Sequence, residues 1–202
     1  MIIVPYLLCG INTAIIVTKI KTGEDIRTLG SGNAGLTNTL RTQGKIAALF
    51  VLLGDVLKGT LSILIVRFSF LWLTGTDTAN PDNMMTYVGF AAAVAAIIGH
   101  VFPIYFGFKG GKAVATSIGV LIPLAFWQLL IAVCICLFLI WRSGFVSLGS
   151  LALVTAMPIL LALSGKFGLL PLSLIILALV FWSHRENIRR LAKGEEKTWI
   201  KK

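Results

Sequence analysis

Small polar residues and glycines gather in the segment from Gly30 to Arg41, which reads GSGNAGLTNTLR. Glycines let backbone N–H groups approach an anion closely, and short side chains such as Ser31, Asn33 and Asn38 add further donors. The Arg41 guanidinium can hold a phosphate or a carboxylate through two parallel hydrogen bonds. The segment is therefore either an anion site or a solvated loop whose polar residues cap a helix.

A second glycine-rich segment follows an apolar run and contains a pair of glycines between two lysines. It reads GHVFPIYFGFKGGKAVATS, and Lys109, Gly110, Gly111 and Lys112 are expected to open a helix. Backbone amides at a helix N-terminus, with lysines beside them, form a phosphate site. The spacing is not that of a Walker A loop. The lysines could instead only set membrane orientation, but the double glycine favours the phosphate site.

Two later segments carry the remaining candidate polar groups. RSGFVSLGS, from Arg142 to Ser150, places Ser147 at the mouth of a helix, where capping is the alternative. HRENIRRLAKGEEK begins with His184 and Asn187 three residues apart, on one helix face. His184 is the leading group that titrates near neutral pH. A basic helix lying on anionic lipid would explain the arginines that follow, but not these two side chains.

Several common kinds of site are missing from the sequence. It contains no cluster of His, Cys and acidic residues spaced for a metal, no GxSxG nucleophile elbow and no HxxxxD pair. An inverted repeat of broken helices, typical of many transporters, is not evident. A transporter for a phosphorylated metabolite and a lipid phosphotransferase are therefore the weaker alternatives. The pattern favours an enzyme that joins a polar phosphate substrate to a lipid.

The composition places these segments in a membrane protein. Of the 202 residues, 57% are apolar and 13% are charged, against about 25% charged in soluble domains. A soluble domain of this size could not bury so much apolar surface, so lipid must cover part of it. In a membrane protein, the positive residues behind the net charge of +10 determine how the chain is oriented in the membrane. No nucleic-acid partner is therefore expected. Cys9, Cys134 and Cys136 all lie in apolar runs and are predicted to be small buried residues.

The apolar runs predict an all-α bundle with seven transmembrane helices, one of them short. A run of about 30 residues would be near 45 Å long as a helix, too long for one perpendicular span. Pro123 lies inside it, so we expect two elements, Ala113–Ile122 and Pro123–Trp141. The other predicted spans are Ile2–Ile20, Ile46–Leu73, Tyr87–Phe108, Val146–Leu163 and Gly168–Trp182. The chain is expected to be a single domain over residues 1–202.

The distribution of positive charge predicts the orientation. With the N-terminus outside and the C-terminus in the cytosol, 15 of the 18 lysines and arginines face the cytosol, as the positive-inside rule requires. The loop Thr74–Thr86 would lie outside and carries two Asp and no Lys or Arg. All four polar segments would then share the cytosolic face. Asp55 and Lys58, one helical turn apart within a span, are expected to pair with each other or to act in function.

The polar segments resemble the motifs of one enzyme family. DIRTLGSGNAGLTNTLR at Asp25–Arg41, GHVFPIYFGFKGGKAVAT at Gly99–Thr116 and HRENIRRLAKGEE at His184–Glu196 are similar to those of the bacterial acyl-phosphate:glycerol-3-phosphate acyltransferases of the PlsY type. VSLGS at Val146–Ser150 also resembles family sequence. Leu36 and Ala113 replace the usual Ala and Gly, and neither change removes a polar group.

The resemblance implies the reaction and its setting. An acyl-phosphate would donate its acyl group to the 1-hydroxyl of glycerol 3-phosphate, giving lysophosphatidic acid and phosphate, the first step of phospholipid biosynthesis. No cofactor or metal is implied. The expected partners are the two substrates and membrane lipid. The enzyme would act as a monomer in the bacterial inner membrane, with its site on the cytosolic side.

Roles for the residues follow as hypotheses. Ser31, Asn33, Asn38 and Arg41 would hold one phosphate or polarise the acyl carbonyl, and the family assigns glycerol 3-phosphate to Lys109, Gly110, Gly111 and Lys112. Ser147 would add a contact to substrate. His184, with Asn187 as its partner, would orient or deprotonate the attacking hydroxyl, unless a substrate phosphate is the base. Glu196 is expected to be structural, through pairing with a nearby Arg.

Overall fold

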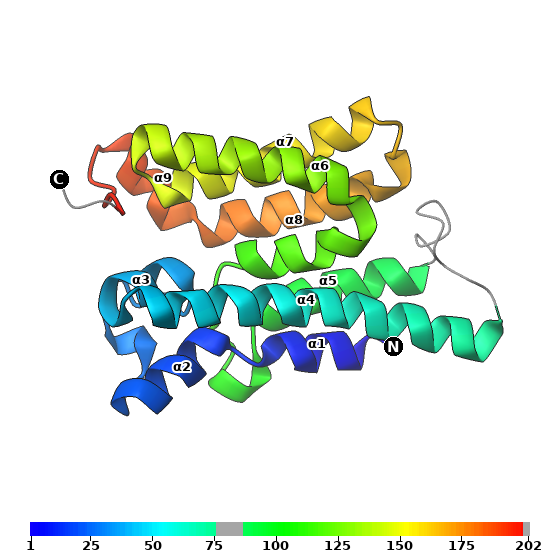
Figure 1. Cartoon of the computed structure of the whole chain (residues 1–202), viewed down its shortest axis with the longest axis horizontal. Helices are drawn as coiled ribbons and strands as arrows, with labels where there is room; N and C mark the ends of the chain where they lie inside the picture. Colours follow the sequence, from blue (N-terminus) through cyan, green and yellow to red (C-terminus); the bar gives the residue numbers. More distant parts are fainter. Residues whose placement is uncertain (76–86, 200–202) are drawn as a thin grey trace. The chain divides into compact units, whose positions relative to one another are not determined.

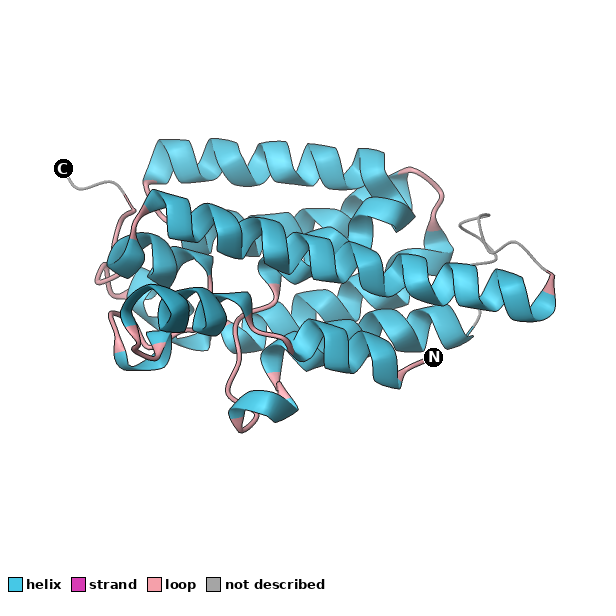
Figure 2. Ribbon diagram, turned by 60° about the horizontal axis from the view of Figure 1, so that its bottom comes forward, coloured by secondary structure: helices cyan, strands magenta, loops and turns pink. Residues whose placement is uncertain are grey.

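The computed structural model describes residues 1–75 and 87–199, and these residues form helices and loops only (Figures 1 and 2). The all-α prediction is confirmed. The α-helices are α1 Ile3–Gly10, α2 Thr13–Thr22, α3 Leu36–Gln43, α4 Lys45–Thr74, α5 Tyr87–Val101, α6 Val114–Ser143, α7 Val146–Leu163, α8 Leu170–Ser183 and α9 Arg185–Ala192. Three short 3-10 helices join them: η1 Ile26–Thr28, η2 Ile104–Phe106 and η3 Phe167–Leu169.

The chain divides into two compact units, at Leu124 and Ala125 within α6. In the first unit, α4 packs against α1, α2, α3 and α5, and α1 lies along α5 (Figure 1). Glycine allows the closest of these approaches. A Cβ at Gly99 of α5 would overlap the Tyr6 carbonyl oxygen of α1, and one at Gly119 of α6 would overlap the Val56 carbonyl oxygen of α4. Small residues at such crossings are typical of membrane helices.

The first predicted span is two helices rather than one. Asn12 interrupts the apolar run, and its side-chain oxygen accepts a hydrogen bond from Ile15 N at 3.1 Å, which caps α2. Lys58 of α4 donates to the Ile11 carbonyl at 2.8 Å and forms an ion pair with Asp55 at 2.8 Å. The predicted pairing within α4 is therefore present. The break between α1 and α2 leaves the Ile11 carbonyl without a hydrogen-bond partner inside a helix. The buried Lys58 ammonium supplies the missing donor.

In the second unit, α7 packs against α8, and α6 approaches α7 closely at one glycine. A Cβ at Gly149 would lie 2.7 Å from the Cys136 carbonyl oxygen. Helix α8 ends at Ser183, and the chain bends by 63° at His184 into α9. This bend brings the polar residues of α9 to the end of the apolar helices.

Within residues 1–75 and 87–199, five helical segments are long and apolar enough to cross a membrane, with α1 and α2 counted together as Ile3–Thr22. The number is six if the bent pair Phe167–Ser183 and Arg185–Ala192 counts as one span. Trp72 and Trp127 are 85% and 70% exposed, so lipid is the medium that can cover them. The break predicted at Pro123 occurs at Ala125, which has non-helical φ −149° and ψ 52°. The count of seven crossings and the orientation stay predictions. Of the loop Thr74–Thr86, all but Thr74 and Gly75 lies outside the described residues.

Candidate functional site

The first glycine-rich loop is built around the side chain of Asn38. Its amide nitrogen donates to the carbonyls of Ile26 at 3.2 Å and Leu29 at 2.9 Å, and its oxygen accepts from Ser31 N at 2.9 Å. Asn38 is 1% exposed. The sequence prediction placed Asn38 against a phosphate, whereas these bonds use its amide group to hold the loop. The predicted contact with substrate stays untested.

The other candidate groups of this loop lie nearer the surface. Ser31 and Arg41 are exposed, and Asn33 is half-buried. Helix α3 begins directly after Gly35 and carries Arg41 in its last turn. Ser31 and Arg41 therefore lie at the surface of the loop, while the Asn38 side chain holds its backbone from within.

The second glycine loop is folded back onto the end of α5. Gly110 N donates to the Val101 carbonyl at 3.0 Å, and Gly111 N donates to the His100 carbonyl at 3.2 Å. These amides were predicted to face a phosphate. They instead bind carbonyls that the end of α5 leaves unpaired within the helix.

The two glycines have a packing role in this loop. A Cβ at Gly110 would overlap the His100 carbonyl oxygen, and a Cβ at Gly111 would overlap His100 Nε2. The helix α6 begins at Val114, just after Lys112. Lys109 is exposed and Lys112 is half-buried. The two glycine amides thus already bond backbone carbonyls of α5, and the predicted contact of Lys109, Gly110, Gly111 and Lys112 with a phosphate stays a prediction.

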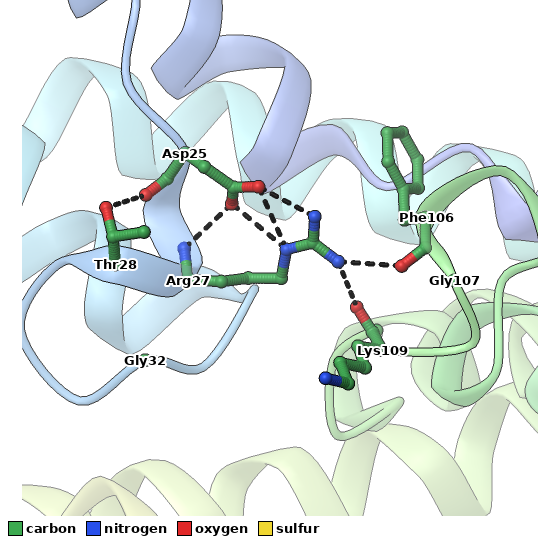
Figure 3. Close-up of a pocket in the computed structure, with 8 residues that line it drawn as sticks. Asp25, Arg27, Thr28, Gly32, Phe106, Gly107 and Lys109 are labelled. Atoms are coloured by element: carbon green, nitrogen blue, oxygen red, sulfur yellow. Dashed lines mark hydrogen bonds and ion pairs between the residues drawn. The ribbon is translucent and has the colours of Figure 1, made fainter.

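A pocket of about 560 Å³ lies where the two glycine loops meet (Figure 3). Its lining comes from both loops: Asp25, Arg27, Thr28, Gly32, Phe106, Gly107, Lys109 and Gly110. Lys109 and Gly110 were predicted site residues. Asp25 and Arg27 were missed as individual site residues, although the Asp-Ile-Arg sequence before the first glycines could have indicated an ion pair across a tight turn.

Arg27 connects the walls of this pocket. Its guanidinium pairs with Asp25 at 2.7 Å and donates to the Phe106 carbonyl at 2.7 Å and the Lys109 carbonyl at 3.3 Å (Figure 3). The hydrogen bonds from Arg27 lower the pKa of the Asp25 carboxyl below its ordinary value. Asp25 therefore stays ionised at neutral pH and offsets the charge of Arg27. Lys109 is then the lining residue whose positive charge has no counterion among the lining side chains.

The second unit holds a cluster centred on Glu196. Its carboxylate, 6% exposed, accepts from Ser147 Oγ at 2.8 Å, Asn187 Nδ2 at 2.7 Å and Arg190 Nε at 2.8 Å. Burial raises the pKa of the Glu196 carboxyl, but the hydrogen bonds from these three donors outweigh burial, so the pKa lies below its ordinary value. The structure thus joins three predicted site residues, and the expected pairing of Glu196 with an arginine is present.

His184 occupies the turn between α8 and α9 and is 3% exposed. Its Nδ1 lies 2.9 Å from the Val180 carbonyl oxygen. Since a carbonyl can only accept, Nδ1 carries the proton in this contact, and in the neutral ring Nε2 then carries the lone pair. Asn187, its predicted partner, directs its amide to Glu196. Across residues 1–75 and 87–199, no three His, Cys, Asp or Glu side chains gather as a metal site would require.

Comparison with known proteins gives the same family over nearly the whole chain. Residues 1–194 match the model of the family described as glycerol-3-phosphate acyltransferase. The glycerol-3-phosphate acyltransferase of Lawsonia intracellularis is 52% identical over 198 residues, which are 98% of this chain and 93% of that protein.

Two solved structures share the fold. Both are crystal structures of PlsY (YgiH), an integral membrane glycerol 3-phosphate acyltransferase. Its glycerol 3-phosphate form is 34% identical with a TM-score of 0.87, and its lysophosphatidic acid form is 32% identical with a TM-score of 0.84. Each similarity covers 98% of this chain and 92% of the other. The chain therefore belongs to the glycerol-3-phosphate acyltransferase family of integral membrane enzymes.

Proposed function

We propose that this chain transfers a fatty acyl group from an acyl-phosphate to the 1-hydroxyl of glycerol 3-phosphate, giving lysophosphatidic acid and inorganic phosphate. The observation that carries the proposal is the pocket between the two glycine loops, with Lys109 in its lining. A relative of the same fold has a glycerol 3-phosphate form and a lysophosphatidic acid form, the acceptor and the product of this reaction.

The phosphates are assigned to cationic and hydroxyl side chains. Lys109 and Lys112 bind glycerol 3-phosphate, while Ser31, Asn33 and Arg41 bind the acyl-phosphate or polarise its carbonyl. Two anions repel each other, so the main task of these groups is to hold both substrates together, and positioning of this kind is worth several orders of magnitude in rate. Gly110, Gly111 and Asn38 contribute by fixing the loops that carry these side chains.

The transfer itself needs little from the protein beyond positioning. The 1-hydroxyl oxygen forms a bond to the acyl carbon, the bond from that carbon to the phosphate oxygen breaks, and inorganic phosphate leaves. The hydroxyl proton passes to a base. Phosphate is a good leaving group, so acid catalysis of its departure is not required.

Either His184 or a substrate phosphate is the base. The bond from His184 Nδ1 to Val180 supports His184, because it leaves the lone pair of the neutral ring on Nε2. In this assignment Asn187 and Ser147 contact substrate, and Glu196 fixes both of them.

The setting follows from the same family membership. We assign the enzyme to the bacterial inner membrane, with residues 1–202 as one acyltransferase domain, its site on the cytosolic side, and activity as a monomer without a cofactor. The family match over residues 1–194 supports a single domain.

The test is acyl transfer by the purified protein in lipid. Labelled glycerol 3-phosphate is supplied with palmitoyl-phosphate or with palmitoyl-CoA. Lysophosphatidic acid from palmitoyl-phosphate alone is the expected result. Product from palmitoyl-CoA alone would overturn the donor, and no product from folded protein would overturn the reaction and favour transport of a phosphorylated metabolite.

His184→Ala separates the two bases. General-base catalysis is typically worth about 10²–10⁴-fold in rate, so a loss in that range at saturating substrates assigns the base to His184. A loss of less than about tenfold assigns it to a substrate phosphate.

A further inference from the structure

Arg27, paired with Asp25, joins the pocket's two walls through its hydrogen bonds to the carbonyls of Phe106 and Lys109 (Figure 3). Asp25 opens η1, where its carboxylate also accepts from Arg27 N at 2.9 Å. From there the Arg27 guanidinium reaches 79 and 82 residues along the chain, to the carbonyls of Phe106 and Lys109.

The geometry requires an arginine held by a carboxylate. Arg27 Nε and Nη2 both contact Asp25, at 3.0 and 2.7 Å to Oδ2, which orients the guanidinium plane. Nη1 is then directed at the two carbonyls. The planar guanidinium carries five donors in a fixed fork, so Nε and Nη2 can bind the carboxylate while Nη1 binds the two carbonyls. A lysine ammonium has three donors and no such fork.

The segment that Arg27 holds includes a strained position. Phe108, between the two carbonyls, has φ 60°, a left-handed value that is uncommon for a residue other than glycine. Such a conformation persists only where surrounding contacts enforce it. The next residue is Lys109, whose side chain lines the pocket.

We propose that Asp25 and Arg27 are positioning residues, which hold the Phe106–Lys109 segment so that Lys109 meets the phosphate of the acceptor. This inference rests on the proposed function for its kinetic consequence. Its structural consequence, a segment held by the pair, can be measured without any turnover.

A role of Asp25 as a negative charge alone and a role in orienting Arg27 predict opposite changes in KM for glycerol 3-phosphate. If Asp25 only added negative charge to a pocket that binds an anion, then Asp25→Asn would strengthen binding and lower KM for glycerol 3-phosphate. If Asp25 orients Arg27, the same change releases the guanidinium and KM rises. The direction of the change in KM therefore distinguishes an orienting role of Asp25 from a purely electrostatic one.

The experiment measures KM and kcat of Asp25→Asn and Arg27→Lys in the full-length protein at saturating palmitoyl-phosphate. We expect KM for glycerol 3-phosphate to rise about tenfold in each, the effect of losing one charge-assisted contact, with a smaller change in kcat. The double variant should be little worse than either single variant, because both break the same contact. Glu186→Gln, which alters an exposed carboxylate in a 3.8 Å pair with Arg189, is the control and should match the unaltered protein.

Amide hydrogen exchange over residues 104–111 is the second measurement. Both variants should exchange faster there than the unaltered protein, with unchanged exchange in α8. Unchanged or lower KM together with unchanged exchange would overturn the inference. If the unaltered protein yields no lysophosphatidic acid, the proposed reaction fails, and the exchange result alone decides whether the pair holds the segment. If Asp25→Asn does not fold, Arg27→Lys, which keeps the charge, decides both measurements.

Discussion

Glu196 shows how a single buried carboxylate can organise a polar cluster. It receives one donor from α7 and two from α9, so each of its two oxygens accepts at least one hydrogen bond. Charge-assisted bonds of this kind are shorter and stronger than neutral ones. Because the donors belong to segments about 40 residues apart, Glu196 fixes the tail that follows α9 as well as the side chains of Ser147 and Asn187.

Glu196→Gln is expected to destabilise the protein by about 2–3 kcal/mol, because an amide donor would then face the Arg190 guanidinium and leave a charged group poorly paired. Denaturation of the detergent-solubilised protein measures the loss. Glu186→Gln, in an exposed pair, should change stability by less than about 1 kcal/mol. Equal effects of the two changes would contradict a special role for the Glu196 cluster.

The same variant has a predictable dependence on pH. The folded-state pKa of Glu196 is lowered, so its ionised form contributes stability that is present above the unfolded-state pKa of about 4.3 and is lost as pH falls through the folded-state pKa. The stability difference between the unaltered protein and Glu196→Gln should therefore be constant near neutral pH and shrink below about pH 4. A difference that grows toward acid pH would contradict the lowered pKa.

Gly111 and Gly10 offer a matched pair of glycine changes. Gly111→Ala would press a Cβ onto His100 Nε2 and to 2.7 Å from the Ala34 carbonyl oxygen, so we expect a loss of about 1–3 kcal/mol from overpacking. At Gly10, in α1, the nearest atom to a Cβ would be 3.4 Å away. Gly10→Ala should be neutral or gain up to about 1 kcal/mol. Thermal unfolding in one detergent compares them, and losses of similar size would show that the loop packs loosely.

The sequence located both glycine loops but not the direction of their amide groups. Glycine pairs indicate a close backbone approach, yet the sequence does not say whether an anion or another carbonyl is approached. For Gly110 and Gly111 the partner is the end of α5, a consequence of how that helix terminates at Val101. Similarly, the role of Arg27 depends on two backbone carbonyls about 80 residues away, which no local pattern reveals.

At the scale of elements, the break between α1 and α2 depends on two charges in the middle of α4. Asp55 and Lys58 side chains are 3% and 7% exposed. Lys58 binds the Ile11 carbonyl, and Asp55 accepts from Thr13 Oγ1 at 3.0 Å, so the pair contacts both sides of the break. His100 Nδ1 lies 3.8 Å from the same carboxylate and 3.0 Å from Thr116 Oγ1, which connects the pair to α5 and α6.

Removing one charge of the Asp55–Lys58 pair should destabilise the protein more than removing both charges. Lys58→Met leaves Asp55 as an unpaired buried charge and is expected to destabilise the protein by about 3–5 kcal/mol. The double variant Asp55→Leu/Lys58→Met should recover most of that loss, since a buried ion pair is often replaceable by apolar residues. Lys45→Met, at the exposed start of α4, is the control. Chemical denaturation measures the stability of the three variants. A double variant as unstable as Lys58→Met would show that the hydrogen bonds to Ile11 and Thr13, rather than the unpaired charge, account for the loss of stability.

The elements themselves were largely predictable because apolar runs and helix breakers are local features. The break in α6 falls at Ala125, two residues after the proline that predicted it. The break at Asn12 was not predicted, although the polar interruption was visible in the sequence. An asparagine inside an apolar run can bind a neighbouring helix without ending its own, and here its capping bond to Ile15 N and the support of Lys58 decide the outcome.

For the whole molecule, the kink in α6 determines the topology. If α6 crosses the membrane once, six spans place the two ends of the chain on the same side. If the chain crosses on both sides of the kink, seven spans place them on opposite sides. The segment from Val114 to Leu124 is about 16 Å long as a helix, which is shorter than the roughly 30 Å apolar core. The positive-inside rule favours seven, because the basic residues after His184 then face the cytosol.

Cysteine labelling in intact cells distinguishes these topologies. Ser164→Cys lies between α7 and η3, and Glu195→Cys follows α9; both sites are exposed, and neither change removes a positive charge that sets orientation. In a chain whose three native cysteines are replaced by serine, a membrane-impermeant maleimide should label Cys at 164 and not at 195. Lysed cells, in which both should react, are the control. With six spans and the N-terminus outside, the two sites exchange sides, so labelling at 195 alone would contradict seven crossings and would place the Glu196 cluster on the outer face.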